Sequence, residues 1–181
     1  MSLPTAMAFG TIGNWASSPW VFDGYNTAIV FHDFKQDHGP GQSYHDDAVI
    51  HRYEDVNVAR DGSDPTIPSH LILNKDNGWL YIVDIGNDRV IRMNTATGSF
   101  SSTLTGYESV AEYATHMGVE RETVVDTGLE QPCGIDIIED RMIVSDYANG
   151  DSRFYDISET PALYLGKIET GDDGITGVKI G

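Results

Sequence analysis

The stretch YIVDIGNDRVIRM, from Tyr81 to Met93, decides the fold class of this chain. An apolar run ends at Asp84, four turn-forming residues follow, and a second apolar run begins at Arg89. This order is typical of two short antiparallel strands joined by a tight turn, because Gly, Asn and Asp accept backbone conformations that other residues avoid. A related stretch, MIVSDYANGDSRFYDI, covers residues 142–157, so the chain repeats a hairpin unit.

The chain is strongly acidic, which limits its partners. Its 181 residues carry 28 acidic and 11 basic side chains, a formal net charge of −17, which argues against nucleic acid as a partner. No apolar run reaches the roughly 18 residues that cross a bilayer, so we expect a soluble protein without membrane insertion. Secretion or a periplasmic location stays open, because a signal peptide could have been removed and the single Cys133 forms no internal disulfide.

Three short segments mark the starts of repeated units: PSHLIL (68–73), PCGIDI (132–137) and ITGVKI (175–180). After the first two come a turn, a second strand, an Asn/Gly turn, a third strand, and a more polar fourth strand expected at 99–104 or 162–168. Four short antiparallel strands per unit are typical of a β-propeller blade. The 43 residues from Gly134 to Gly177 fit the usual blade period of about 40–50 residues.

The spacing between the first two starts is longer. His70 and Gly134 are 64 residues apart, about 20 more than one blade needs. Within this excess, apolar side chains recur on one helical face, and Ser109 and Glu112 have capping-box spacing. We therefore predict an amphipathic α-helix inserted at about 107–122.

The stretch LYIVDIGNDRVIRM, together with the strand openers PSHLIL and QPCGIDI, resembles the NHL-repeat family. The resemblance implies an all-β propeller of four-stranded antiparallel blades, with about three blades in this chain. The expected units are a divergent first blade (1–66), an NHL-like blade with the helical insertion (67–127), a second NHL-like blade (128–171), and the inner strand of a further or closing blade (172–181).

The chain is too short for a complete propeller ring. A six-bladed ring needs roughly 260 residues at the usual blade period. Either the sequence is a piece of a longer protein, or two copies close one ring as a two-fold homodimer. Both hypotheses stay open at this point.

The repeated hairpin predicts a structural role for six residues in its turn. The Asp carboxylates can accept turn N–H groups, the Asn residues suit the left-handed conformation, and the Arg side chains can pair back onto the Asp. These residues are Asp84, Asn87 and Arg89 in the first copy, and Asp146, Asn149 and Arg153 in the second.

Ligands of propellers usually lie at one mouth of the central channel, so residues at the starts of inner strands are candidate binding residues. By register, these channel-mouth residues are Ser69, His70, Cys133 and Thr176. The strand openers are also similar to those of the peptidyl-α-hydroxyglycine amidating lyase branch, which uses zinc. That resemblance implies His70 and Cys133 as metal ligands, since both residue types bind zinc.

Two other groups of polar residues offer metal chemistry or plain solubility. One is the His- and Asp-rich segment with His32, Asp33, Asp37, His38, His45, Asp46, Asp47 and His51. The other is the set of carboxylates that precede inner strands, Asp61, Asp64, Glu130 and Asp173, which lactonase-type propellers would use around calcium.

The sequence predicts a binding module that presents its channel-mouth loops to a protein, peptide or small molecule. The alternative is a zinc- or calcium-dependent propeller enzyme, amidating-lyase-like or lactonase-like. Whether the chain is an enzyme stays open, because the fold serves both classes.

Overall fold

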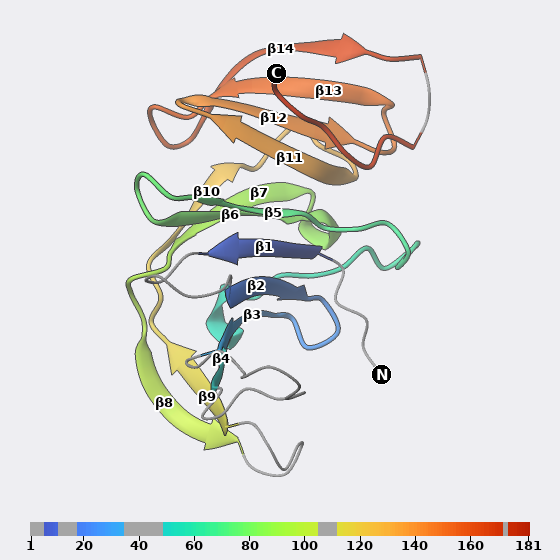
Figure 1. The fold of residues 1–181 in the computed structure, drawn as a ribbon. Coiled ribbons are helices and arrows are strands. Elements are labelled where there is room, and N and C mark those ends of the chain that lie inside the picture. The colour runs from blue at the N-terminus through green and yellow to red at the C-terminus, as the bar shows by residue number, and fades with distance from the viewer. Residues whose placement is uncertain (1–5, 11–17, 35–48, 105–111, 172–173) are drawn as a thin grey trace, which may run out of the picture.

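The computed structural model describes residues 6–10, 18–34, 49–104, 112–171 and 174–181 (Figure 1). These residues form three β-sheets and two 3₁₀ turns, η1 (Glu54–Val56) and η2 (Ile85–Asn87), with no α-helix among them. The predicted all-β class is confirmed. None of the described helical segments is long and apolar enough to cross a membrane.

The first sheet combines two parts of the chain that lie far apart in sequence. Its strands in spatial order are β1 (Ala6–Gly10), β2 (Ser18–Asp23), β3 (Ala28–Asp33), β4 (Val49–Tyr53), β9 (Glu112–Met117) and β8 (Ser99–Leu104). The first four strands form an antiparallel meander. β9 then joins β4 in parallel, and β8 pairs antiparallel with β9.

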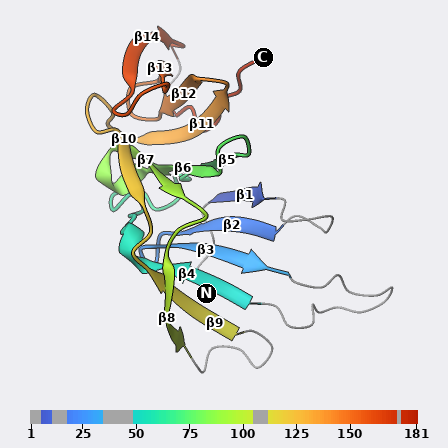
Figure 2. The same ribbon diagram turned by 90° about the vertical axis from the view of Figure 1, so that its left-hand side faces the viewer.

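The second and third sheets are four-stranded and antiparallel throughout. The second sheet contains β5 (Leu71–Asn74), β6 (Trp79–Asp84), β7 (Arg89–Asn94) and β10 (Arg121–Val125). The third contains β11 (Pro132–Ile138), β12 (Arg141–Asp146), β13 (Asp151–Asp156) and β14 (Leu163–Glu169). Figures 1 and 2 show the three sheets following one another, with the second sheet between the other two.

The central position of the second sheet explains the continuous apolar sequence of β6. Side chains of a strand alternate between its two faces. Leu80 and Ile82 belong to the core shared with the first sheet, whereas Tyr81 and Val83 belong to the core shared with the third. All four are at most 1% exposed. Burying such a side chain contributes about 1.5–3 kcal/mol, so β6 is stabilised from both sides.

The predicted inserted helix at about 107–122 is wrong. Residues 112–117 are strand β9 and the next strand, β10, begins at Arg121, while residues 105–111 lie outside the described part of the chain. A helix of two turns would bury one apolar stripe only. In the sheet, Ala114 and Thr115 are both buried although they face opposite sides, and β4 and β8 pair with both edges of β9.

The predicted fourth strand of the second unit also lies elsewhere. Residues 99–104 form β8 of the first sheet, and β10 occupies the position beside β7. The hairpin of β8 and β9 is therefore inserted between the third and fourth strands of the second sheet. It accounts for the extra residues between His70 and Gly134.

The starts of β5 and β11 lie side by side although they belong to different sheets. The backbone N–H of His70 donates to the carbonyl of Cys133 (3.1 Å), and Cys133 Sγ lies 3.1 Å from the carbonyl O of Pro68. The third predicted start, 175–180, is not a strand, yet the carbonyl O of Thr176 lies 3.6 Å from the same Sγ. The three segments meet at Cys133, but the described residues form no closed ring of sheets.

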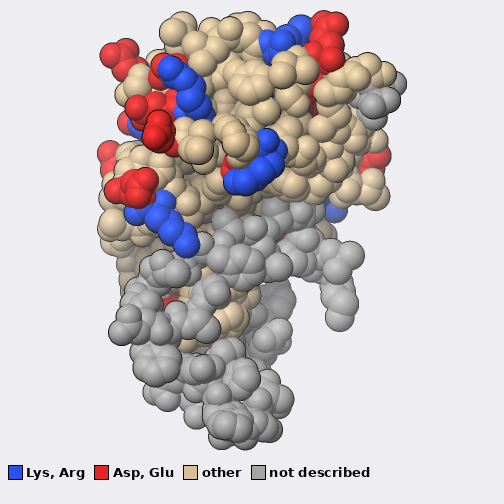
Figure 3. Space-filling model, turned by 45° about the horizontal axis from the view of Figure 1, so that its top comes forward, with Lys and Arg blue, Asp and Glu red and all other residues tan. Residues whose placement is uncertain are grey.

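Two ion pairs connect cationic side chains with carboxylates of the third sheet. Arg141 pairs with Asp156, and Lys179 pairs with Asp136 at 3.0 Å. Figure 3 shows acidic and basic side chains next to one another on the face that carries this sheet. Exposed pairs add little to stability, so buried carboxylates are the stronger electrostatic constraints.

Gly134→Ala is expected to destabilise the protein by about 1–3 kcal/mol, because it overpacks a filled site. A Cβ at Gly134 would lie 2.9 Å from the Cα of Gly177 and 3.0 Å from the carbonyl O of Thr176. Urea unfolding measures the loss. Gly62→Ala is the matched control, because nothing lies within 4 Å of its added Cβ. Equal losses in the two variants would contradict the contact.

Candidate functional site

The loops that enter the first strands of the second and third sheets share an edge with the turns that follow β6 and β12. In the second sheet, the N–H of Gly86 donates to the carbonyl of Ala59 (2.9 Å). In the third, the N–H of Tyr147 donates to the carbonyl of Gln131 (2.8 Å). We name this region the loop edge; it consists of loops 57–67 and 129–131 and turns 85–88 and 147–150.

Asp84 fixes the loop edge of the second sheet from a fully buried position. Its Oδ1 accepts a hydrogen bond from the backbone N–H of Ala59 (2.7 Å). Its Oδ2 accepts bonds from Asn87 Nδ2 (2.9 Å) and Arg89 Nε (2.7 Å). Burying a carboxylate costs free energy unless hydrogen bonds and a counter-charge replace the water. The loop at Ala59 therefore stabilises the folded protein by supplying a donor to Asp84.

The backbone of this turn differs from the predicted one. Asp88, rather than Asn87, has the left-handed conformation, with φ of 52°. Gly86 is required for space, because an added Cβ would collide with the carbonyl O of Arg60. Asn87 contributes through its side chain, which bonds to Asp84.

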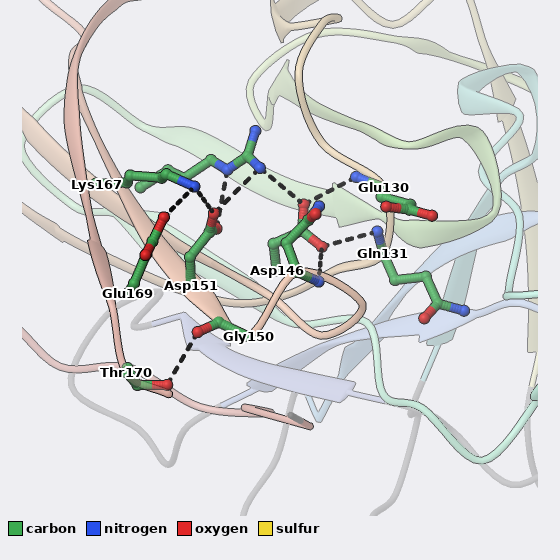
Figure 4. Close-up of polar contacts among 10 residues, drawn as sticks. Glu130, Gln131, Asp146, Gly150, Asp151, Lys167, Glu169 and Thr170 are labelled. Atoms are coloured by element: carbon green, nitrogen blue, oxygen red, sulfur yellow. Dashed lines mark hydrogen bonds and ion pairs between the residues drawn. The ribbon is translucent and has the colours of Figure 1, made fainter. Parts of the chain in front are cut away.

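Asp146 has the equivalent position in the third sheet and is also fully buried. Its carboxylate accepts hydrogen bonds from the backbone N–H groups of Glu130 (2.8 Å), Gln131 (3.1 Å) and Asn149 (3.3 Å) (Figure 4). The loop before β11 is therefore tied to the turn after β12. Both sheets use one buried carboxylate to join a turn to a loop.

The partner that Arg153 binds most closely is Asp151. Arg153 Nε and Nη2 lie 2.9 and 3.2 Å from the Asp151 carboxylate, whereas Nη2 lies 3.8 Å from Asp146. Lys167 Nζ also donates to Asp151 (3.1 Å) and pairs with Glu169 at 3.0 Å (Figure 4). Burial alone would raise the pKa of Asp151, but the hydrogen bonds from Arg153 and Lys167 leave this pKa below its usual value.

Asp61 joins the loops of two different sheets. Its Oδ2 accepts a hydrogen bond from Gln131 Nε2 (2.6 Å), and its Oδ1 accepts bonds from Ser63 N (2.6 Å), Ser63 Oγ (2.6 Å) and Asp64 N (2.9 Å). The bond from the Ser63 hydroxyl is the main reason that the pKa of Asp61 is lowered to about 2. Sequence reasoning missed the pairing with Gln131, although it placed Asp61 before a first strand.

Negative charge accumulates along the loop edge. Asp88 and Glu130 are exposed there, beside the buried carboxylates. The pKa of Asp88 is raised, first by partial burial of its carboxylate and then by the nearby carboxylates of Asp146, Asp61, Glu130 and Asp84. The loop edge therefore favours a positively charged ligand over an anion.

The predicted channel-mouth residues are close to one another, mainly through their backbones. Ser69 is 1% exposed, and its Oγ has no hydrogen-bond partner among the described residues. His70 is partly buried, and burial lowers its pKa. Cys133 is fully buried beside the backbone of Thr176, whose residue is exposed. Cys133 therefore serves as a contact between segments.

The structure lends no support to a metal site at His70 and Cys133. The described residues contain no group of three or more His, Cys, Asp or Glu side chains that could hold a metal ion. Burial raises the pKa of Cys133 to about 12, and its Sγ contacts the carbonyl oxygens of Pro68 and Thr176. Of the carboxylates considered for calcium, Asp61 is taken up by hydrogen bonds, and Asp173 lies outside the described residues.

The His- and Asp-rich segment is described only in part. Its members Asp37, His38, His45, Asp46 and Asp47 lie outside the described residues. His51 Nδ1 lies 2.8 Å from Nε2 of His116, and His51 Nε2 lies 3.8 Å from Asp33. This contact ties β4 to β9, and His116 could not be identified from local sequence because its partner is 65 residues away.

No protein-family model matches this chain, and a comparison with curated proteins found no similar sequence. The resemblance to NHL repeats therefore stays a prediction from the sequence.

Asp84→Asn and Asp146→Asn are each expected to destabilise the protein by about 2–4 kcal/mol, because each leaves a buried network with one acceptor fewer and no counter-charge. Urea unfolding gives both values. The matched control is Asp76→Asn, an exposed aspartate whose carboxylate accepts no hydrogen bond from a described residue. If Asp76→Asn costs as much as the other two, the carboxylates do not have the proposed role.

Stability is expected to fall in acid partly through Asp61. Its folded pKa of about 2 lies below the usual 3.8, so the carboxylate stabilises the folded protein above pH 3.8, and this contribution is lost as the pH falls through about 2. The urea midpoints of the wild type and Asp61→Asn should therefore converge between about pH 5 and pH 2. A gap that stays constant over this range, as expected for the control Asp76→Asn, would contradict the prediction.

Proposed function

We propose that the chain forms about three blades of an NHL-type β-propeller and acts as a binding module whose ligand contacts the loop edge. The ligand is a protein, peptide or small molecule that presents positive charge. The observation that carries this proposal is the fixed and acidic loop edge. The buried Asp84 and Asp146 hold its loops in place, while the exposed Asp88 and Glu130 are accessible to a ligand.

The arrangement of the sheets supports the propeller part of the proposal. The second and third sheets each contain four antiparallel strands, and the starts of β5 and β11 are neighbours. β1 to β4 repeat the same meander in the first sheet. In a β-propeller, the first strands of neighbouring blades lie next to each other at the central axis, and the other strands of each blade follow away from the axis. Two copies would supply six such units, so a two-fold ring is part of the proposal, and a single-chain mass by light scattering would remove it.

The rigidity of the loop edge supports a binding role. Backbone N–H groups from both loops are bonded to buried carboxylates, and the Asp61–Gln131 bond joins the two loops to each other. Loops that are already ordered lose less conformational freedom on binding. Fixed carboxylates on such loops attract and orient a cationic partner.

No observation favours the alternative of a zinc- or calcium-dependent enzyme. Cys133 bonds to backbone carbonyls, and His70 has no described side-chain partner that would complete a metal site. The enzyme hypothesis stays a prediction from the sequence.

The double variant Asp88→Asn/Glu130→Gln is expected to weaken binding of a basic peptide about fivefold, because it removes two exposed charges from the proposed contact. The probe is a fluorescein-labelled hexapeptide that alternates Arg and Gly. Fluorescence anisotropy at low ionic strength measures its Kd, and binding should weaken further as salt is added.

The control must have the same net charge, because any basic peptide is attracted to an acidic protein. Asp76→Asn/Glu139→Gln removes two exposed carboxylates from the turns at the opposite ends of β6 and β12. This control should bind the peptide like the wild type. Equal weakening in both double variants, or no binding by the wild type, would contradict the proposal.

A further inference from the structure

A groove of about 510 Å³ lies between the outer strands of the second and third sheets. Val124 and Val125 of β10 line one side, and Tyr155 and Lys167 of β13 and β14 line the other. The N–H of Ala162 donates to the carbonyl of Val124 (2.8 Å), which ties the segment before β14 to the second sheet. This volume is within the range of small-molecule sites, about 300–1,000 Å³.

The groove is lined by hydrogen-bond donors that the protein leaves unused. Arg153 binds Asp151 through Nε and Nη2, whereas its Nη1 bonds to no described residue. Nη1 reaches the wall at Gly128, where an added Cβ would lie only 3.2 Å from it. The hydroxyl of Tyr155 also has no described partner. Burial raises the pKa of Tyr155 to about 12, so this hydroxyl keeps its proton at neutral pH.

Asp151 holds the cations of the groove in place. It is fully buried and accepts bonds from both Arg153 and Lys167. The Arg153 side chain is 13% exposed and that of Lys167 is 41% exposed, so both still reach the groove. Asp151 offsets one of the two cations, and Glu169, which is 74% exposed, pairs with Lys167 at 3.0 Å. Because an exposed ion pair is weak, a ligand carboxylate can compete with Glu169 for Lys167. A dianion would add excess negative charge close to Asp126 and Asp146.

The apolar and aromatic residues that line the groove indicate what the uncharged part of a ligand would be. Val124, Pro161 and Ala162 provide apolar surface, and Tyr164, which is 51% exposed, packs edge-on against Tyr155 with ring centroids 5.7 Å apart and an interplanar angle of 61°. Carboxylates accept strong charge-assisted hydrogen bonds from Arg and Lys. Apolar and aromatic walls favour an apolar or aromatic body.

We propose that this groove binds an organic monocarboxylate with an apolar or aromatic body. The carboxylate accepts hydrogen bonds from Arg153 Nη1, the Tyr155 hydroxyl and Lys167 Nζ, and the body lies against β10 and Tyr164. This site is separate from the loop edge and does not depend on the function proposed for that edge.

The probe is 4-phenylbutanoate, and its neutral isostere 4-phenylbutanamide is the matched ligand. Titration is followed by ¹H–¹⁵N NMR of the whole chain. The acid is expected to bind with a Kd on the order of 1 mM, as for a small ligand of average efficiency, with shifts at residues 124–128 and 153–167. The amide should bind at least about tenfold more weakly. Equal binding of acid and amide, absence of saturation, or shifts elsewhere would overturn the proposal.

Two variants test the assigned donors without breaking the bonds between Arg153 and Asp151. Tyr155→Phe removes one hydroxyl and keeps the ring, and Lys167→Gln removes one charge. Each should weaken binding of the acid about fivefold, and Lys167→Gln should weaken binding of the amide less than binding of the acid, because the amide carries no charge. Tyr25→Phe and Lys75→Gln make the same chemical changes at exposed positions outside the groove and should bind like the wild type.

The loop-edge variant Asp88→Asn/Glu130→Gln separates the two proposals. It should bind 4-phenylbutanoate like the wild type, so a failure of the groove and a failure of the loop edge give different results. If Tyr155→Phe and Lys167→Gln bind the acid as tightly as their controls do, the donors are wrongly assigned and the proposal falls.

Discussion

The arrangement of the second and third sheets depends on one constraint: a buried carboxylate at the end of the second strand must be supplied with donors. Asp84 and Asp146 are both fully buried, and the adjacent loop donates one backbone N–H to Asp84 and two to Asp146. A charge taken out of water costs several kcal/mol unless such donors replace the water. If the loops moved away, these carboxylates would either be exposed to water or remain buried without hydrogen-bond donors. This requirement determines the conformation of the loops.

Features that depend on local sequence could be predicted. The turn after Asp84 follows from residues within five positions of it, and β11 to β14 follow one another in the chain as in the sheet. The strand character of β9 could not be predicted in this way. Its pairing with β4 joins residues about 63 positions apart, and a short segment with apolar side chains at mixed spacing fits a helix or a strand equally well.

In the candidate site, too, contacts between residues close in sequence could be predicted, whereas contacts between distant residues could not. Arg89 lies directly opposite Asp84 in the ladder, so their pairing was accessible from spacing. In the third sheet, the residue opposite Asp146 is Asp151, and Arg153 lies two residues further along β13. The two turns have the same length, but the Arg lies two residues further from the turn in the third sheet than in the second. Lys167, which is opposite Arg153 in the next strand, completes the group, and no motif in the sequence connected it with Asp151.

This division between buried and exposed charge affects what the surface can do. Because hydrogen bonds to the buried carboxylates hold the loops, substitution of the exposed Asp88 and Glu130 leaves the loop conformation intact. The same holds in the groove, where Asp151 orients Arg153 and Lys167 while one edge of each remains open to a ligand. A protein with a net charge of −17 repels anions at long range, so an anion binds only where local cations are held in fixed positions. The geometry around Asp151 is such a place, and the loop edge, where carboxylates gather, favours ligands of the opposite charge.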